Sequence, residues 1–217
     1  DMAVGIAALL GYQLPRNFGP ALLSRDLGEM WRLWHITLGT WFRDYVFAPL
    51  VKNRRDPGAI AGGLFITMTL IGFWHGADWK FIVWGSLQGM AMAYLTFTRL
   101  RNRREKKAKL PYIVALPLTF GFTTLASAFF RADDMRTAVG VLIADFSGSS
   151  GISSITIYPL LAFATLGLIH GGWHRYDFEN RIVRIPGMWF AVGCGVALAV
   201  AFAFTPREIR PFVYFQF

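Results

Sequence analysis

The fold class of this chain is decided by the run Ala59-Ile-Ala-Gly-Gly-Leu-Phe-Ile-Thr-Met-Thr-Leu-Ile-Gly-Phe-Trp-His75, in which Thr67 and Thr69 are the only polar side chains before the imidazole. As a helix, the apolar part rises about 24 Å, somewhat less than the roughly 30 Å hydrocarbon core of a bilayer. His75 would therefore lie within the membrane. Ionisable side chains at that depth cost a few kcal/mol, usually face a protein-lined cavity, and are candidates for function.

The rest of the chain has the composition of a polytopic membrane protein. Of its 217 residues, 54% are hydrophobic and only 16% are charged, which favours this class over a soluble domain. The apolar runs predict an all-α transmembrane protein in which residues 1–217 form a single membrane domain. The predicted spans are residues 59–75, 79–98, 112–130, 152–169 and 187–205.

The net charge of +9 is distributed unevenly and sets the expected topology. The loop from Arg99 to Lys109 holds seven basic residues against Glu105, so the positive-inside rule places it in the cytoplasm. Alternation then places Lys52 to Arg55 on the same side, in agreement with its own charge. Nucleic-acid binding is the other interpretation of a basic loop, but no aromatic or fold pattern of that class accompanies it.

Residues 24–47 follow a helical period, with apolar side chains on one face and charged ones on the other. This pattern predicts one amphipathic helix of about twenty residues. Asp26 followed by Glu29 resembles a capping box at its start, and Pro49 is expected to end it. The segment is too polar to span, so we expect it along the cytoplasmic interface or between spans. His35 lies where the two faces meet. It is interpreted either as a surface histidine at the membrane interface or as a functional residue.

Two features of the sequence bear on His75 directly. Asp78 follows three residues later, and one helical turn would bring its carboxylate close enough to orient the imidazole, provided that no break occurs at Gly76. Trp74 is interpreted as a membrane-interface residue or as a cavity wall. Glycines four residues apart favour close packing of two successive spans; they are Gly72, Gly76, Gly85 and Gly89.

Metal chemistry receives little support from the sequence. His170 and His174 have a spacing that is compatible with metal binding, but the glycines between them disfavour a helix, and Asp177 is the only third ligand nearby. We therefore predict no metal site.

Two motifs resemble the membrane-bound O-acyltransferase family, most closely its alginate O-acetyltransferase branch: Ser24-Arg-Asp-Leu-Gly-Glu-Met-Trp-Arg-Leu-Trp-His-Ile-Thr-Leu-Gly-Thr-Trp-Phe-Arg-Asp-Tyr45 and Gly72-Phe-Trp-His-Gly-Ala-Asp-Trp79. The resemblance implies a multi-helix membrane fold around a cavity reached from both faces. It implies a catalytic histidine at His75 and a second important histidine at His35. The family's N-terminal helices are missing, so we interpret the chain as the C-terminal part of such a protein.

The chain departs from the family pattern at three places. Leu33 stands where members often have a second arginine, and Val51-Lys-Asn-Arg54 replaces a Gly-Gly-Asn-Arg. Gln88 stands where members often have histidine. The last two departures bear on contacts to the donor or acceptor, and not on the chemistry at His75.

The resemblance implies acyl transfer from a cytoplasmic acetyl donor, such as acetyl-CoA, to hydroxyls of an exported polysaccharide, with no tightly bound cofactor. His75 would act as general base, because imidazole titrates near neutral pH. His35 would position the donor or relay a proton from the opposite end of one passage, and Asp78 would orient His75. The further candidate substrate-binding residues are Trp74, Arg32, Arg43, Asp44 and Gln88.

The expected setting is a multi-pass protein of the bacterial inner (cytoplasmic) membrane. Membrane lipids, the exported polysaccharide and accessory acetyltransferase or polysaccharide-export proteins are the expected partners. Two alternatives stay open: transfer of D-alanine to teichoic acid, and a transporter or proton channel in which His75 and Asp78 form a relay. The first would leave ester-linked alanine, whereas the second would move charge without forming an ester.

Overall fold

The computed structural model describes residues 2–102, 110–147, 165, 167–168, 172 and 184–203, and the regular structure of these residues is entirely helical. This confirms the all-α class. The chain divides into two units, Asp1–Ala162 and Phe163–Phe217. In the second unit the structure describes one long helix, α11 (Gly187–Ala203). Most of the expected span at 152–169 lies outside the described residues, as do His170, His174 and Asp177.

The first unit contains every residue of the two family-like motifs. Its helices are α1 (Met2–Leu9), η1 (Ala21–Leu23), α2 (Leu27–Leu33), α3 (Ile36–Phe42), the π-helix η2 (Arg43–Phe47), α4 (Ala48–Val51), α5 (Pro57–His75), α6 (Trp79–Arg101), α7 (Tyr112–Arg131) and α8 (Met135–Ser147). Of the described helices, α5 and α7 are long and apolar enough to cross a membrane.

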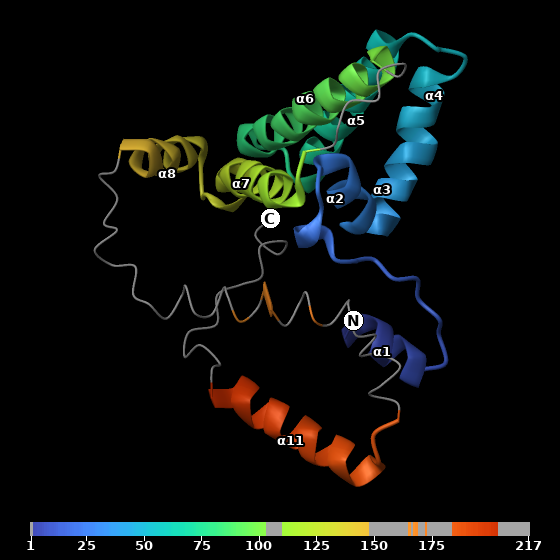
Figure 1. Ribbon diagram of the computed structural model, residues 1–217, viewed down its shortest axis with the longest axis vertical. Coiled ribbons are helices and arrows are strands. Elements are labelled where there is room, and N and C mark those ends of the chain that lie inside the picture. The colour runs from blue at the N-terminus through green and yellow to red at the C-terminus, as the bar shows by residue number, and fades with distance from the viewer. Residues whose placement is uncertain are drawn as a thin grey trace. The chain divides into compact units, whose positions relative to one another are not determined.

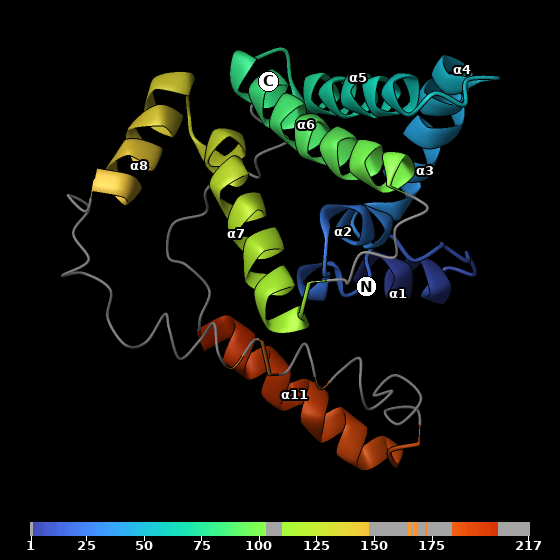
Figure 2. The same ribbon diagram turned by 45° about the horizontal axis from the view of Figure 1, so that its top comes forward.

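Helices α5 and α6 form an antiparallel hairpin at the centre of this unit (Figures 1 and 2). The two backbones touch at glycines, because a β-carbon on Gly85 would lie 2.9 Å from the Cα of Gly72 and 2.6 Å from the carbonyl oxygen of Met68. A β-carbon on Gly89 would similarly lie 2.9 Å from the carbonyl oxygen of Phe65. The predicted close packing is thus confirmed at three of the four glycines.

The fourth glycine, Gly76, ends α5 directly after His75. The chain then turns, and Asp78 becomes the N-cap of α6, accepting a 3.1 Å hydrogen bond from the Lys80 N–H. An Asp at this position satisfies an otherwise unpaired backbone donor of the first turn. The break therefore fixes His75 at the last position of α5, beside the loop that enters α6.

The single helix predicted for residues 24–47 is wrong. It is interrupted after Leu33, where Trp34 is extended and His35 adopts the left-handed conformation, with φ 48° and ψ 53°. Pro49 does not end the segment either, since α4 continues to Val51. The π-helix η2 precedes α4, and its wider turn places Pro49 near the start of a new helix, where a missing N–H is tolerated.

The segment between Asp26 and Val51 runs along α6 and returns along α5. Asp26 pairs with Arg99 at the end of α6, with 2.8 Å between Oδ2 and Nη2. At the other end of the hairpin, the imidazole of His35 lies near the ring of Trp74. On the return, the side chain of Val51 lies close against Gly63. The segment thus packs against both helices of the hairpin, and its expected place relative to the membrane stays a prediction.

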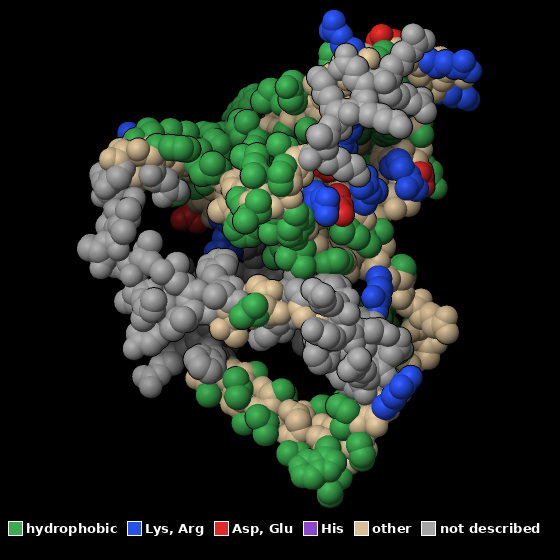
Figure 3. Space-filling view, viewed as in Figure 1, with side chains coloured by type: hydrophobic (Ala, Val, Ile, Leu, Met, Phe, Trp, Pro, Cys, Tyr) green, Lys and Arg blue, Asp and Glu red, His purple; other side chains and the backbone are tan. Residues whose placement is uncertain are grey.

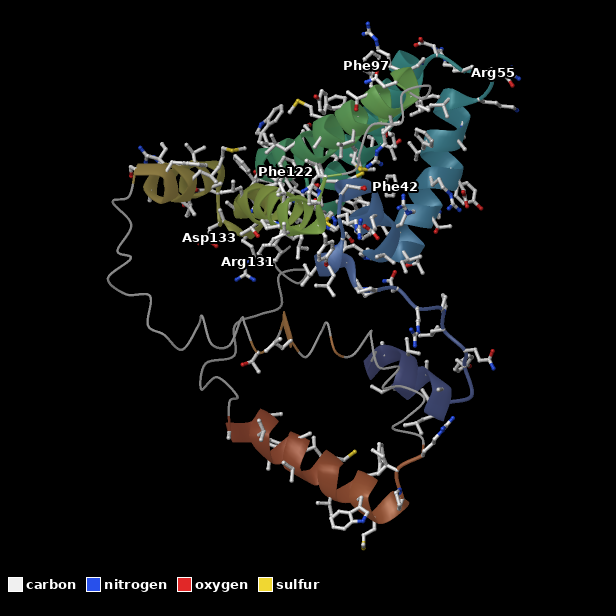
Figure 4. All side chains as sticks on the ribbon, viewed as in Figure 1. Phe42, Arg55, Phe97, Phe122, Arg131 and Asp133 are labelled. Atoms are coloured by element: carbon white, nitrogen blue, oxygen red, sulfur yellow. The ribbon has the colours of Figure 1, made fainter. Side chains whose placement is uncertain are left out.

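The core of the unit joins the returning segment to the hairpin and to α7. Phe42, labelled in Figure 4, is buried together with Met68, Ile71, Trp84 and Ala126. Helix α7 is also tied to the chain before α2 by hydroxyl groups, because Tyr112 Oη donates to the carbonyl oxygen of Leu23 at 2.9 Å and Thr119 Oγ1 to that of Arg25 at 3.0 Å. Hydroxyl–backbone bonds of this kind suit helices in an apolar medium.

Charge and apolar surface are separated on this unit. Hydrophobic side chains cover the visible face of α6, α7 and α8, whereas Lys and Arg side chains lie where α4 meets α5 and, mixed with Asp and Glu, in a second group lower on the unit (Figure 3). Lys52, Arg54 and Arg55 are exposed there. Arg99 and Arg101 lie at the same end of the hairpin, in the last turn of α6. The basic segment before α5 and the start of the basic segment after α6, both predicted to be cytoplasmic, are therefore on the same side.

Replacing Asp26 by alanine is expected to destabilise the protein by about 1 kcal/mol, because Asp26 Oδ1 caps α2 by accepting from the Glu29 N–H at 3.0 Å. Burial raises the pKa of Asp26, but the Glu29 N–H and Arg99 outweigh it, so that the pKa lies below its ordinary value of 3.8. The stabilisation is complete above that value and is lost as the pH falls through the lower, folded-state pKa. Thermal unfolding in detergent between pH 3 and 7 measures both effects.

The matched control is Arg99→Met, which removes the exposed ion pair but leaves the cap. Such pairs contribute about 0–1 kcal/mol. An Arg99→Met protein that lost as much stability as Asp26→Ala would contradict the importance of the cap.

Candidate active site

His75 lies in a cluster of aromatic rings from three helices. Its ring centroid is 4.9 Å from that of Trp74, 4.9 Å from that of Phe130 and 5.5 Å from that of Trp84. Phe81 completes the cluster at 6.5 Å and contacts Phe130 at 5.2 Å. We call these four side chains the ring cluster. An imidazole held by such rings is shielded from water on several sides, which strengthens any electrostatic interaction that it makes with a reactant.

Trp74 connects the two histidines predicted to be functional. Its ring lies 6.4 Å from that of His35, edge to face, and it also contacts His75. Trp74 remains 53% exposed among the described residues. The expectation that His35 and His75 mark opposite ends of a passage is wrong, because one indole contacts both. The break at Trp34–His35 is the reason, since it brings His35 to the C-terminal end of α5.

His35 is held by a loop that precedes α2. Asn17 Nδ2 lies 3.3 Å from His35 Nδ1, and the Asn17 carbonyl oxygen accepts from the Ile36 N–H at 2.8 Å. Phe18 contacts the same imidazole at 5.6 Å. Burial holds the pKa of His35 below its ordinary value, so the neutral imidazole predominates at neutral pH.

A sequence model of the membrane-bound O-acyltransferase family (MBOAT) matches residues 2–131, which include both histidines and the ring cluster. The chain belongs to the membrane-bound O-acyltransferase family. Because the family is membrane-bound and α5 and α7 have the length and composition of spans, the chain is part of a membrane protein.

Three relatives illustrate the range of the family. A peptidoglycan O-acetyltransferase of Helicobacter pylori is 35% identical over 74% of this chain and 29% of its own length. A probable alginate O-acetylase of Azotobacter vinelandii is 34% identical over 100% of this chain and 50% of its own length. A teichoic acid D-alanyltransferase of Streptococcus thermophilus is 34% identical over 58% of this chain and 35% of its own length. The chain thus spans half the length of these relatives or less.

Asp78 does not occupy the position expected from a continuous helix. The turn that would place its carboxylate beside His75 is broken at Gly76, and Asp78 caps α6 instead. Its described role is to fix the start of the helix that carries Phe81 and Trp84. Asp78 is thus, in the described structure, the N-cap residue of that helix.

Gln88 supports the site through α2. It is fully buried, and its Oε1 accepts a 3.2 Å hydrogen bond from Trp31 Nε1. Trp31 in turn contacts Trp84 of the ring cluster, with 5.9 Å between the ring centroids. Gln88 Nε2 has no hydrogen-bond partner among the described residues. This position, where members of the family often have histidine, therefore links α2 to α6.

The charged candidates lie apart from the ring cluster. Arg43 and Asp44 pair with each other at the start of η2, with 2.8 Å between Nε and Oδ1, and both are exposed. The hydrogen bond from Arg43 lowers the pKa of Asp44. Arg32 extends toward the start of α2, where its Nη1 would lie 3.8 Å from a β-carbon on Gly28. Of these side chains, Arg32 lies near the basic end of the hairpin, since its Nη1 and the Nη1 of Arg99 would both be within 4 Å of a β-carbon on Gly28.

Phe130 and Lys80 are contributors that the sequence did not reveal. Lys80 Nζ donates to the carbonyl oxygens of Ala132 at 2.7 Å and Asp133 at 3.0 Å. It also lies 5.0 Å from the centre of the Phe81 ring. Lys80 thus ties the start of α6 to the residues after α7, near the labelled Asp133 in Figure 4, and holds Phe130 in the ring cluster. The only sequence signal for Lys80 is that it directly follows the second motif.

Replacing Lys80 by methionine is expected to lower acyl transfer several-fold and to cost about 1–2 kcal/mol of stability, because two hydrogen bonds from a charged donor are lost while the aliphatic stem is kept. Lys80→Arg is the matched control, since it retains the charge and donor groups. Transfer rate and thermal unfolding of the two full-length variants measure the effect. Equal behaviour of both variants would contradict the role given to the two carbonyl contacts.

The described residues contain no group of three His, Cys, Asp or Glu side chains suited to a metal ion. They do place His75 in the ring cluster and His35 on the other side of Trp74. The side-chain amide of Asn17 is hydrogen-bonded to His35. Imidazoles in this arrangement are suited to moving or donating protons to a bound reactant.

Proposed function

We propose that the full-length protein transfers an acetyl group from a cytoplasmic donor to hydroxyls of an exported polysaccharide, with His75 as general base. The observation that carries this proposal is the contact of both motif histidines with Trp74, within the region matched by the MBOAT family. Two relatives are named for O-acetyl transfer, to peptidoglycan and, as a probable activity, to alginate, which supports acetate as the transferred group.

In the proposed reaction His75 takes the proton of the acceptor hydroxyl. The hydroxyl oxygen then forms a bond to the acyl carbon, and the bond from that carbon to the donor's leaving group breaks. If the donor is acetyl-CoA, the sulfur leaves as thiolate and takes up the proton held by His75. An imidazole is suited to both transfers because its pKa lies near neutral. The donor is a co-substrate, and the proposal includes no tightly bound cofactor.

The proposed setting is the bacterial inner membrane, crossed several times. Membrane lipids would surround α5 and α7, whose exposed side chains are largely apolar. The basic end of the hairpin would face the cytoplasm, where Arg32 would be near an anionic donor. Arg43 could contact such a donor only by exchanging it for Asp44, its present partner. Accessory acetyltransferase or polysaccharide-export proteins are the partners we propose, because an exported acceptor must reach the membrane.

Transfer of D-alanine to teichoic acid is the second candidate, favoured by the relative from Streptococcus thermophilus. It would use the same two histidines and the same proton transfers. Membership of the MBOAT family disfavours the third alternative, a transporter or proton channel, because that activity forms no ester.

The experiment that tests the proposal is a comparison of ester-linked groups on exported glycans. Cells that lack the gene are complemented with the full-length protein or with an empty vector, and base-labile acetate and D-alanine are measured on the purified glycan. Acetate that returns only with the gene supports the proposal. Ester-linked alanine in its place would assign the second candidate, and the return of neither group would contradict ester transfer.

A further inference from the structure

The side-chain amide of Asn17 makes hydrogen bonds to two residues at the break between α2 and α3. Its Oδ1 lies 2.9 Å from the Thr37 backbone nitrogen and 2.9 Å from Thr37 Oγ1. Its Nδ2 lies 3.3 Å from His35 Nδ1. One side chain thus contacts the residue that breaks the helix and the second residue of α3.

The backbone N–H of Thr37 determines which way this amide faces. A backbone N–H can only donate, so the atom opposite it must be the amide oxygen. The amide nitrogen therefore faces His35. Because Asn Nδ2 also can only donate, His35 Nδ1 must accept and carries no proton. In the neutral ring the proton then resides on Nε2.

Protonation of His35 would place two donors against each other. An imidazolium has N–H groups at both ring nitrogens, and its Nδ1–H would face Asn17 Nδ2–H. Burial of the ring disfavours the charged form and outweighs a backbone contact that favours it, so the pKa of His35 lies below its ordinary value.

We propose that Asn17 is a positioning residue that holds His35 as the neutral Nε2–H tautomer, so that His35 acts as a hydrogen-bond donor and not as a base. The tautomer is a property of this chain alone, whereas its use rests on the function proposed above. In acyl transfer, the Nε2–H would donate to the carbonyl oxygen of the acyl group as negative charge develops on it, while His75 takes the hydroxyl proton. The two histidines would then have different and complementary roles.

Asn17→Asp is the decisive variant, because it changes a donor into an acceptor at nearly constant shape. One carboxylate oxygen can still accept from Thr37, but the other would accept a proton from His35 Nδ1. The variant would therefore move the proton to Nδ1 or stabilise the imidazolium. The donor at Nε2 is lost in the first case, and in the second a cation is created beside Trp74.

The measurement is the ¹⁵N NMR spectrum of histidine-labelled full-length protein in detergent, with His35 assigned from a His35→Gln sample. We expect the Nε2–H tautomer in the wild-type protein and the Nδ1–H tautomer or the imidazolium in Asn17→Asp. A wild-type His35 protonated at Nδ1 would overturn the proposal, and so would an unchanged tautomer in Asn17→Asp. The wild-type spectrum is decisive even if the variant does not fold.

Activity provides the second readout. If Asn17→Asp moves the proton to Nδ1, kcat is expected to fall by about 100-fold, the usual effect of losing one oxyanion donor, with little change in the KM of the acyl donor. An imidazolium would keep the Nε2–H donor and therefore most of kcat. Thr37→Val is the matched control, because it removes the hydroxyl contact to Asn17 but keeps the backbone N–H. It should keep both the tautomer and kcat, and an equal loss of kcat in Thr37→Val would reduce Asn17 to a structural role.

These readouts separate the inference from the proposed function. If no acetate is transferred but the wild-type spectrum shows Nε2–H, the function fails and the tautomer assignment stands. If acetate is transferred but Asn17→Asp changes neither the tautomer nor kcat, the assignment fails and the function stands.

Discussion

Replacement of His75 by alanine in the full-length protein is expected to lower acyl transfer by about 10²–10⁴-fold, the usual contribution of a positioned general base. The ring cluster explains the size of the effect. The rings that contact His75 include Trp74, Trp84 and Phe130, and none of these three can accept a proton from a hydroxyl. Ester-linked acetate on the exported glycan, compared at matched membrane levels of the two proteins, measures the loss.

Alanine also removes packing, so a second variant separates chemistry from structure. His75→Gln retains much of the volume and a polar end but cannot act as a base near neutral pH. Both variants should lose transfer, and His75→Gln should unfold close to the wild-type temperature. Tyr94→Phe serves as the control, because Tyr94 is an exposed residue of α6 and its change should leave transfer unaltered. Wild-type transfer by a correctly inserted His75→Gln protein would show that His75 is not the base.

His75 could be predicted from the sequence because its signal is local. An imidazole at the end of a long apolar run needs no tertiary information to stand out, and α5 does end at that residue. Phe130 could not be found in this way. It comes from α7, and its place against His75 depends on how α7 packs against the hairpin and on the contacts of Lys80 with Ala132 and Asp133.

The break at His35 shows the same difference between a local sequence signal and a contact that depends on tertiary structure. The helical period continues through Trp34 and His35, and it correctly located the cap at Asp26, whose partner is three residues away. The break itself is specified by Asn17, which satisfies the backbone N–H groups of Ile36 and Thr37 at the start of α3. A pattern read along 24–47 contains no information about that earlier loop.

Asp78 illustrates a choice that spacing leaves open. An acidic residue three positions after His75 can pair with it along a helix or can cap the next helix, and both fit the same sequence. Gly76 decides between them, because α5 ends there and α6 starts at Trp79. The glycines within the spans were more informative, because an apolar helix has few other reasons to expose its backbone.

Replacement of Gly85 by leucine is therefore expected to destabilise the α5–α6 hairpin strongly. A β-carbon at Gly85 would meet backbone atoms on the facing helix, 2.6 Å from the Met68 carbonyl oxygen and 3.0 Å from the Gly72 nitrogen. Backbone atoms cannot rotate away as a side chain can, so the helices must separate. Overpacking costs typically 1–3 kcal/mol and occasionally more, and we expect about 3 kcal/mol or more here, a large part of the 5–15 kcal/mol that stabilises a typical protein.

Gly62→Leu is the matched control on the partner helix, because no atom outside the local backbone of α5 and the two chain neighbours lies within 4 Å of a β-carbon at Gly62. Leucine has a higher helix propensity than glycine, so this change should be neutral or slightly stabilising. The yield of monodisperse protein in detergent and its thermal unfolding compare the two variants. A Gly85→Leu protein as stable as Gly62→Leu would contradict the close contact. Separation of the hairpin would also displace Trp84, which immediately precedes Gly85 and contacts His75, so any folded fraction of Gly85→Leu should lose acyl transfer as well.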